Sequence, residues 1–283
     1  MPAVRICERS RERTFPIGPA LIRGAEPIAL DAESGRGVLL LHGFGDTPQT
    51  LRYLAEHLHR AGYSVYAPLY PGHGITADAF FSSTADEWIS FAADSLCEFR
   101  KRVEVVSIVG LSMGAAVAAI LAADDAELGS VVLIAPYLRV PLWLRMALPL
   151  RAIWSVFVGT VEARHPRSIQ DPREREKSLA YGVVNAGAMA QLAKVARKGR
   201  RALPRIEAAT LVIQSSQDPR VASATAHLAI KKSGAQAKRI IWMKAGGHVI
   251  TVDFGKDEVF AEALDWIKQW DGQPQASRLP GKR

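Results

Sequence analysis

Residues 103–123 read VEVVSIVGLSMGAAVAAILAA, and the rest of the chain is organised around this stretch. Its β-branched start is typical of a strand buried on both faces, as in a parallel sheet. The turn Gly110-Leu111-Ser112-Met113-Gly114 follows, and an alanine-rich, helix-like segment comes after it. Because a serine between a strand and a helix adopts a strained backbone, its neighbours two positions away must lack side chains. This G-x-S-x-G context favours a nucleophilic Ser112 over an incidental serine in a glycine-bounded turn.

Length and composition are those of an ordinary globular protein with a sizeable core. The chain has 283 residues, of which 48% are hydrophobic, as expected for one large α/β domain with an insertion. The first thirty residues lack the apolar segment of a secretory signal, and no uncharged run reaches transmembrane length. Two cysteines, Cys7 and Cys97, are too few for a disulfide framework, and Cys97 fits a small core residue. We therefore expect a cytoplasmic protein, at most associated with a membrane surface.

The positive charge is concentrated in one middle segment. The formal net charge is +8, but residues 137–206 alone hold 14 Lys/Arg against 4 Asp/Glu, whereas residues 24–136 hold 6 against 14. The basic residues of this segment are not interleaved with aromatic residues in a recognisable nucleic-acid-binding module, so no nucleic-acid partner is expected. The segment needs an explanation of its own.

Strand and helix patterns alternate along most of the chain. Thr84-x-x-Glu87 predicts a capping box, and Thr47 before Pro48 predicts a helix N-cap. Besides the strand before Ser112, strands are expected at 27–30, 38–41, 64–67, 130–135, 210–214 and 239–243, and helices at 48–61, 84–102, 222–232 and 256–270.

This alternation predicts an α/β fold: a mostly parallel sheet flanked by helices on both faces. It breaks once, between Pro136 and Pro204, where strand patterns vanish and helical stretches lie between prolines. We interpret residues 137–206 as an inserted helical cap on a core formed by residues 24–136 and 207–271. Residues 1–23 are read as an N-terminal extension and residues 272–283 as a flexible tail.

The candidate partners of Ser112 follow two later strands. A serine hydroxyl needs a base to remove its proton, and that base needs an acid to orient it. In parallel sheets such groups lie on loops at the carboxyl ends of strands. Asp218 lies four residues after the strand at 210–214, and His248 lies five residues after the strand at 239–243. The chain order Ser, Asp, His is the order of an α/β-hydrolase triad.

These residues predict a mechanism. His248 takes the Ser112 proton, Asp218 holds the imidazole, and Ser112 attacks an ester carbonyl to give an acyl-enzyme that water hydrolyses. Backbone N–H groups of Phe44 and Met113 are expected to hold the oxyanion. Asp218 as a simple helix cap, and Asp253 as a rival acid, are the alternatives. His42 and His73 are interpreted as loop braces, and no zinc site, phosphate-binding loop or dinucleotide fingerprint is found.

The sequence resembles bacterial carboxylesterases and monoacylglycerol lipases of the α/β-hydrolase superfamily. The resemblance rests on His42-Gly43-Phe44, Pro71-Gly72-His73-Gly74, the Ser112 motif, Asp218 and the run from Gly247 to Asp253, and it covers about Gly24 to Trp270. It implies an α/β-hydrolase fold and hydrolysis of short- to medium-chain acyl esters or monoacylglycerols without a cofactor. The chain departs from such enzymes at Ala115, where a further glycine is common, and in a longer, more basic cap.

The sequence is compatible with three functions. The first is a serine ester hydrolase with a small-molecule ester or lipid as its substrate. The second is an acyltransferase or thioesterase with the same triad, and the third is a non-catalytic binding protein of the same fold. The apolar run at 142–161 and the basic residues around 189–201 suggest a cap that contacts an anionic membrane. The alternative is a solvated cap face over an ordinary apolar pocket.

Overall fold

A seven-stranded, mostly parallel sheet forms the centre of the protein. The computed structural model describes residues 21–147, 149, 159–163, 165 and 168–271. The strand order is β1-β3-β2-β4-β5-β8-β9, and only β1 runs antiparallel to its neighbour. The strands are β1 (Ile28–Leu30), β2 (Arg36–Leu41), β3 (Ser64–Ala67), β4 (Val105–Leu111), β5 (Ser130–Ile134), β8 (Ala209–Ser215) and β9 (Lys238–Met243). This arrangement confirms the predicted α/β fold.

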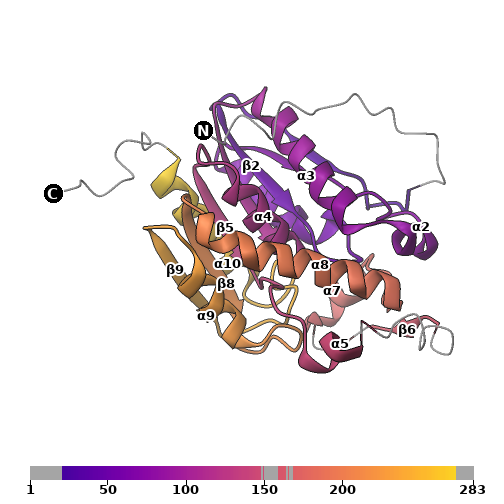
Figure 1. Ribbon diagram of the computed structural model, residues 1–283. Helices are drawn as coiled ribbons and strands as arrows, with labels where there is room; N and C mark the ends of the chain where they lie inside the picture. Colours follow the sequence, from indigo (N-terminus) through magenta and orange to yellow (C-terminus); the bar gives the residue numbers. More distant parts are fainter. Residues whose placement is uncertain (1–20, 148, 150–158, 164, 166–167, 272–283) are drawn as a thin grey trace.

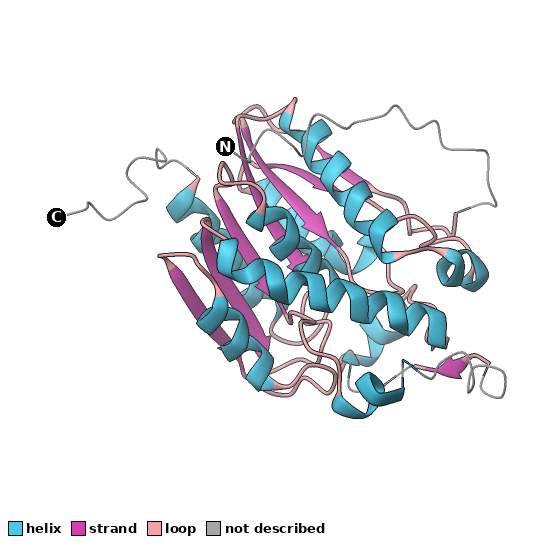
Figure 2. Cartoon of the chain, viewed as in Figure 1, coloured by secondary structure: helices cyan, strands magenta, loops and turns pink. Residues whose placement is uncertain are grey.

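Helices cover both faces of the sheet, and each face has its own apolar layer (Figures 1 and 2). One layer includes residues of α3 (Ala85–Arg100), α4 (Met113–Ala123), α8 (Ala186–Ala202) and α9 (Ser223–Lys232). The other includes residues of the 3₁₀ helix η3 (Pro48–Leu51), α1 (Arg52–Arg60) and α10 (Lys256–Trp270). Strands β4 and β5 are buried along nearly their whole length, because helices shield both faces of these inner strands.

Local signals in the sequence predicted most of these elements. Thr84 and Glu87 form the predicted capping box at the start of α3. Thr47 occupies the predicted N-cap position before Pro48. The first turn is the 3₁₀ turn η3, which α1 continues, and the Thr47 side chain makes no capping hydrogen bond. Its hydroxyl is buried without a partner. The short helix α2 (Ala77–Ser82), capped by Thr76, was not predicted.

The excursion between β5 and β8 contains more than helices. It holds α5 (Leu142–Ala147), α7 (Pro172–Glu176), α8 and the 3₁₀ turn η6 (Leu203–Arg205), and the Asp171 side chain caps α7 from the position before Pro172. The expectation that strands vanish here was wrong, because β6 (Val161–Glu162) pairs with β7 (Val183–Val184) in a small antiparallel sheet. Parts of the apolar run at 142–161, including Arg151, lie outside the described residues.

Helix α8 lies directly on α4 and forms part of the core (Figure 1). A side chain at Gly199 of α8 would come within 2.7 Å of the Ala116 carbonyl oxygen of α4, so the glycine permits this close approach. By contrast, α5 and β6 lie at the edge of the molecule toward which the strand arrowheads of Figure 2 point. The segment predicted as a cap therefore includes both a core-facing helix and peripheral elements.

The structure bears on the predicted terminal segments, on Cys97 and on membrane-spanning helices to different extents. The predicted extension lies outside the described residues up to residue 20, and so does the whole tail at 272–283. Cys97 is buried on α3, as its assignment to the core predicted, but it is disulfide-bonded rather than a free thiol. The cysteine content therefore gives no argument for a reducing compartment. Among the helices described, none has the length and apolar character needed to span a bilayer.

Candidate active site

Ser112 occupies the sharp turn between β4 and α4. Its φ of 56° lies in the left-handed region, which non-glycine residues rarely adopt. The glycines on either side make the turn possible, as the sequence predicted. A side chain at Gly110 would overlap the backbone of Gly114, and one at Gly114 would overlap the carbonyl oxygen of Leu41 on β2. The strain and the packing together fix the serine at the carboxyl end of β4.

Three polar side chains from distant parts of the chain meet at this turn. The Nε2 atom of His248 lies 2.8 Å from the Ser112 Oγ atom, and its Nδ1 atom lies 2.8 Å from an Asp218 carboxylate oxygen. Asp218 follows β8 and His248 follows β9, so both come from loops at the carboxyl edge of the sheet. Ser112 and His248 are only 8% and 9% exposed. The arrangement is a hydrogen-bonded chain from carboxylate to imidazole to hydroxyl.

The surroundings of Asp218 keep it ionised. Burial raises the pKa of its carboxyl group, but the charge and hydrogen bond of His248 and two backbone N–H groups outweigh burial, so that the pKa is lowered overall. The backbone N–H groups are those of Arg220 and Val221, at 2.7 and 3.0 Å. The Gln214 side chain donates a further hydrogen bond of 2.9 Å. Sequence reasoning missed Gln214, because it lies within a buried strand and outside any motif.

The loop after β2 runs past the nucleophile. A side chain built on Gly43 would lie 3.7 Å from the Ser112 Cβ atom, so the backbone of this loop borders the serine. Phe44 is the next residue. Met113 is the first residue of α4, and its N–H therefore belongs to the helix N-terminus, where backbone donors lack intrahelical acceptors. The two residues predicted as oxyanion donors thus belong to the loop after β2 and to the start of α4.

Two buried histidines hold this loop in place. His42 donates from Nδ1 to the Gly43 carbonyl at 2.9 Å and accepts at Nε2 from the Tyr70 N–H at 3.2 Å. His73 accepts at Nε2 from the Gly45 N–H at 3.3 Å. Burial lowers the pKa of His73 to about 4 and that of His42 well below its ordinary value. Both rings are therefore neutral near pH 7, and their hydrogen bonds support their interpretation as loop braces.

Asp46 is a second acidic group near the nucleophile that sequence reasoning missed. The side chain is 6% exposed and accepts a hydrogen bond of 2.8 Å from the Thr47 N–H. The other oxygen of the Asp46 carboxylate lies beside Gly43, and Gly43 also lies beside Ser112. Burial raises the pKa of Asp46 to about 6, although Thr47, Thr50 and the His248 charge oppose the rise. The position of Asp46, two residues after Phe44, was the only feature of the sequence that could have pointed to it. The burial of a loop carboxylate cannot be read from the sequence.

Asp253, the rival acid, lies elsewhere in the site. Its carboxylate receives the backbone N–H groups of Gly247, Gln170, Asp171 and Phe254, at 2.7–2.8 Å. The imidazole of His248 is bonded to Asp218 instead. The preference for Asp218 over Asp253 thus agrees with the geometry around His248.

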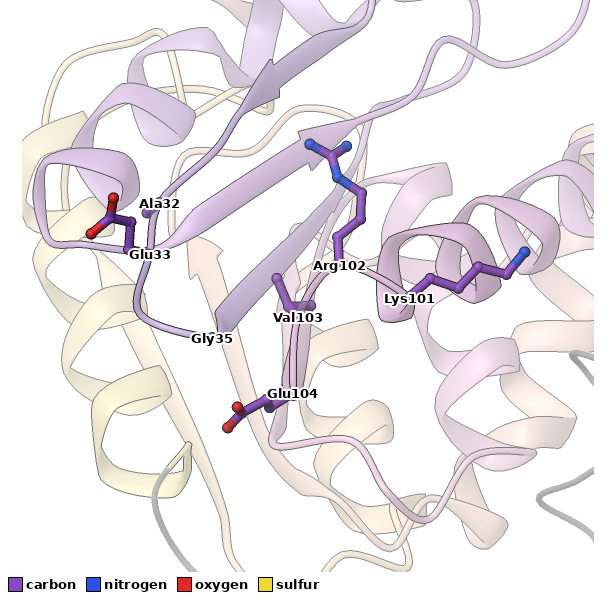
Figure 3. A pocket seen from close by; sticks show the side chains of 7 residues that line it. All are labelled: Ala32, Glu33, Gly35, Lys101, Arg102, Val103 and Glu104. Atoms are coloured by element: carbon purple, nitrogen blue, oxygen red, sulfur yellow. The ribbon is translucent and has the colours of Figure 1, made fainter.

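A surface hollow lies at the opposite edge of the sheet. It is lined by Ala32, Glu33, Gly35 and residues 101–104, which precede β2 and β4. Figure 3 shows that its charged side chains point away from one another rather than toward a common point. Since Ser112 follows the other end of β4, this hollow is separate from the triad.

The chain is similar to known lipases and esterases over most of its length. The family model described as serine aminopeptidase, S33 (Hydrolase_4) matches residues 32–254. A thermostable monoacylglycerol lipase of Bacillus sp. (strain H-257) is 28% identical over 256 residues, covering 89% of this chain and 98% of the relative. A carboxylesterase of Bacillus subtilis (strain 168) is 25% identical and covers 82% of this chain and 94% of the relative.

The chain is also similar to solved structures of lipolytic enzymes. A structure described with LipS and LipT, two metagenome-derived lipolytic enzymes, superimposes with a TM-score of 0.80 at 29% identity and covers 88% of this chain and 100% of its own. The monoacylglycerol lipase of Paleococcus ferrophilus has a TM-score of 0.72 at 19% identity over 86% of this chain and 98% of its own, and shows the likeness of the fold.

Proposed function

The chain belongs to the Hydrolase_4 family, and from this membership we propose that Ser112, His248 and Asp218 form its catalytic triad. The protein is a serine hydrolase that acts on carboxylic esters, in line with its lipase and esterase relatives. Its fold is that of the α/β-hydrolases. The observation that carries the triad assignment is the pair of 2.8 Å hydrogen bonds that joins Asp218, His248 and Ser112.

The geometry supports a two-step mechanism. His248 accepts the Ser112 proton at Nε2 while the Ser112 oxygen forms a bond to the ester carbonyl carbon. The negative charge that develops on the carbonyl oxygen is stabilised by the N–H groups of Met113 and Phe44. His248 then gives its proton to the departing alcohol, which leaves an acyl-enzyme.

Water completes the reaction. His248 takes a proton from a water molecule, whose oxygen attacks the acyl carbon, and the proton returns to Ser112 as the acid leaves. Throughout both steps Asp218 keeps the imidazole proton on Nδ1 and stabilises the imidazolium. A carboxylate ionised near neutral pH is needed for this role, and the lowered pKa of Asp218 meets the requirement.

As the substrate we propose short- to medium-chain acyl esters, including monoacylglycerols. The support comes from the relatives: one is named a monoacylglycerol lipase and another a carboxylesterase. The relatives do not favour an acyltransferase, a thioesterase or a binding protein. Ester hydrolysis by this site needs no cofactor, because the nucleophile, the base and the oxyanion donors all come from the chain.

The test is hydrolysis of p-nitrophenyl esters from C2 to C16, and of a monoacylglycerol, by the wild type and by Ser112→Ala. Activity that varies with chain length and is lost in the variant supports the proposal. The matched control is Ser82→Ala, which changes an exposed serine on α2 and is expected to keep full activity. An inactive wild type, or a Ser112→Ala variant as active as the wild type, would contradict it.

We further propose that residues 137–206 act as a cap whose peripheral part contacts anionic lipid surfaces. On α5, Leu142 and Met146 are each 70% exposed and lie four residues apart, and the exposed Arg145 lies between them. Apolar residues next to a basic one suit an interfacial helix, and a basic residue near anionic lipid contributes about 1 kcal/mol. Helix α8 packs on α4 in the core, so the proposed lipid contact is assigned to α5.

The membrane contact is tested by co-sedimentation with vesicles of phosphatidylcholine, with and without phosphatidylglycerol, at low salt. Binding that requires the anionic lipid and weakens in a Leu142→Gln, Met146→Gln variant is expected. Lys101→Gln, at the opposite edge of the sheet, is the control. Absence of wild-type binding to anionic vesicles at low salt would leave a solvated cap face as the better explanation.

A further inference from the structure

Asp253 is a buried carboxylate that receives four backbone hydrogen bonds. It is 0% exposed. Its Oδ2 atom accepts from the N–H groups of Gly247 and Gln170, both at 2.7 Å. Its Oδ1 atom accepts from the N–H groups of Asp171 and Phe254, both at 2.8 Å. One carboxylate therefore joins the loop that carries His248 to the residues that begin α7.

The same two segments meet on the other side of His248. The N–H of Val249 donates to the Ser168 carbonyl oxygen at 2.9 Å. Hence the residue before His248 is held by Asp253, and the residue after it is held by Ser168. Because Asp253 also holds Gln170 and Asp171, residues 168–171 and Asp253 together fix the backbone on both sides of the base.

Residues 168–171 are bonded to the acid loop as well. The Gln170 side chain donates to the Gln217 side chain at 3.0 Å, next to Asp218. The Arg220 guanidinium donates to the Ser168 hydroxyl at 3.0 Å and to the Ala163 carbonyl oxygen. A segment from the excursion between β5 and β8 thus contacts both the loop of Asp218 and the loop of His248.

We infer that Asp253 is a positioning residue for His248, and that residues 168–171 act with it to hold the base in line with Ser112 and Asp218. This inference rests on the proposed function, because it assigns His248 as the base. Asp253 does not contact the reacting atoms and acts through the backbone of the His248 loop. Such support matters because displacement of a catalytic group by about 1 Å can slow a reaction about 100-fold.

Asp253→Asn tests the inference with little change in shape. A carboxylate offers acceptors on both oxygens, whereas the amide nitrogen of asparagine only donates. In one orientation of the amide, the substituted side chain loses the hydrogen bonds to Gly247 and Gln170, and in the other it loses those to Asp171 and Phe254. Either way two buried N–H groups face another donor, so the His248 loop and residues 168–171 move apart.

We expect the Asp253→Asn variant, as a folded full-length protein, to lose about 10- to 100-fold in kcat for p-nitrophenyl butyrate, with KM within about twofold of the wild type. A second readout does not depend on activity. The His248 proton on Nδ1, hydrogen-bonded to Asp218, should give a low-field proton NMR signal in the wild type. In the variant this signal should broaden or disappear.

Two further variants separate positioning from stability. Asp125→Asn changes a buried carboxylate that is paired with Arg100 after α4, at the opposite edge of the sheet. It should keep kcat and the low-field signal, whatever its effect on thermal stability. If Asp253→Asn does not fold, Asp253→Glu keeps the charge and displaces it by one methylene, and it should show the same loss of kcat and signal.

Unchanged kcat and an unchanged low-field signal in folded Asp253→Asn would overturn the inference. Losses of kcat and signal no larger than those of Asp125→Asn would overturn it as well. Failure of the proposed function has a different signature: wild-type protein without esterase activity. In that case the low-field signal still reports whether Asp253 holds the His248–Asp218 hydrogen bond.

Discussion

The Nε2 atom of His248 lies 2.8 Å from the Oγ atom of Ser112, although the two residues are 136 positions apart in the chain. Strands β4 and β9 bring them together, because both deliver their following loops to the same edge of the sheet. The serine reaches that edge through the strained turn at φ 56°, and the histidine through a loop that is held on both sides. The position of the base relative to the nucleophile is thus set by backbone contacts that substitutions can perturb one at a time.

Asp218→Asn should lower kcat by about 10⁴-fold and leave the fold intact. The asparagine nitrogen can still fill the position next to His248, but it favours the wrong imidazole tautomer, in which Nε2 carries the proton and cannot accept the Ser112 hydrogen. Steady-state kinetics over pH 6–9 measures the change. A loss of less than tenfold would argue that Asp218 is not the acid of the triad.

Gly114→Ala should destabilise the protein by about 3 kcal/mol, because the added methyl group overlaps the Leu41 carbonyl oxygen on β2. Urea unfolding measures the free energy of unfolding. Gly159→Ala is the matched control, since no atom of the described residues lies within 4 Å of the added methyl group there. Equal stability of the two variants would contradict the role assigned to the glycine.

His42→Phe should lower kcat by about 10- to 100-fold, because the loop that carries Phe44 loses two hydrogen bonds, to the Gly43 carbonyl and the Tyr70 N–H. Loss of one oxyanion donor costs about 10²–10³-fold, and displacement of the loop should cost less. His59→Phe, on the partly exposed face of α1, controls for the replacement of a histidine by phenylalanine. A His42→Phe variant with wild-type kcat would show that the loop is held without the imidazole.

The sequence was sufficient for those parts of the site that local patterns encode. The strand, turn and helix around Ser112 and the strand ends before Asp218 and His248 each carry a local signal, and parallel connectivity places all three at one edge. Burial in three dimensions has no such signal. The pairing of Val161 with Val184, the burial of Asp46 and the contact of Gln214 with Asp218 depend on how distant segments pack.

The first turn after Thr47 shows the same limit at short range. Thr47 before Pro48 has the composition of a helix start, yet the neighbouring Asp46 carboxylate accepts the Thr47 N–H and the chain enters a 3₁₀ turn. A propensity describes the residue alone, whereas the loop is shaped by its contacts with the Ser112 turn and by His42 and His73.

Asp46→Asn should stabilise the protein at pH 8 relative to the wild type. Burial raises the pKa of Asp46 from 3.8 to about 6, so the folded protein binds a proton between these values that the unfolded chain has released. The free energy of unfolding of the wild type therefore falls as pH rises through this window, by about 1.4 kcal/mol per pH unit. The asparagine oxygen can still accept the Thr47 N–H, and the uncharged side chain avoids this loss.

Thermal or urea unfolding of both proteins from pH 4 to pH 8 measures the effect. The stability difference in favour of Asp46→Asn should grow from near zero at about pH 4 to as much as about 3 kcal/mol above pH 6. Asp265→Asn controls for the removal of an exposed aspartate, on α10. A difference that stays constant across this range would mean that folding does not raise the pKa of Asp46, and would contradict the prediction.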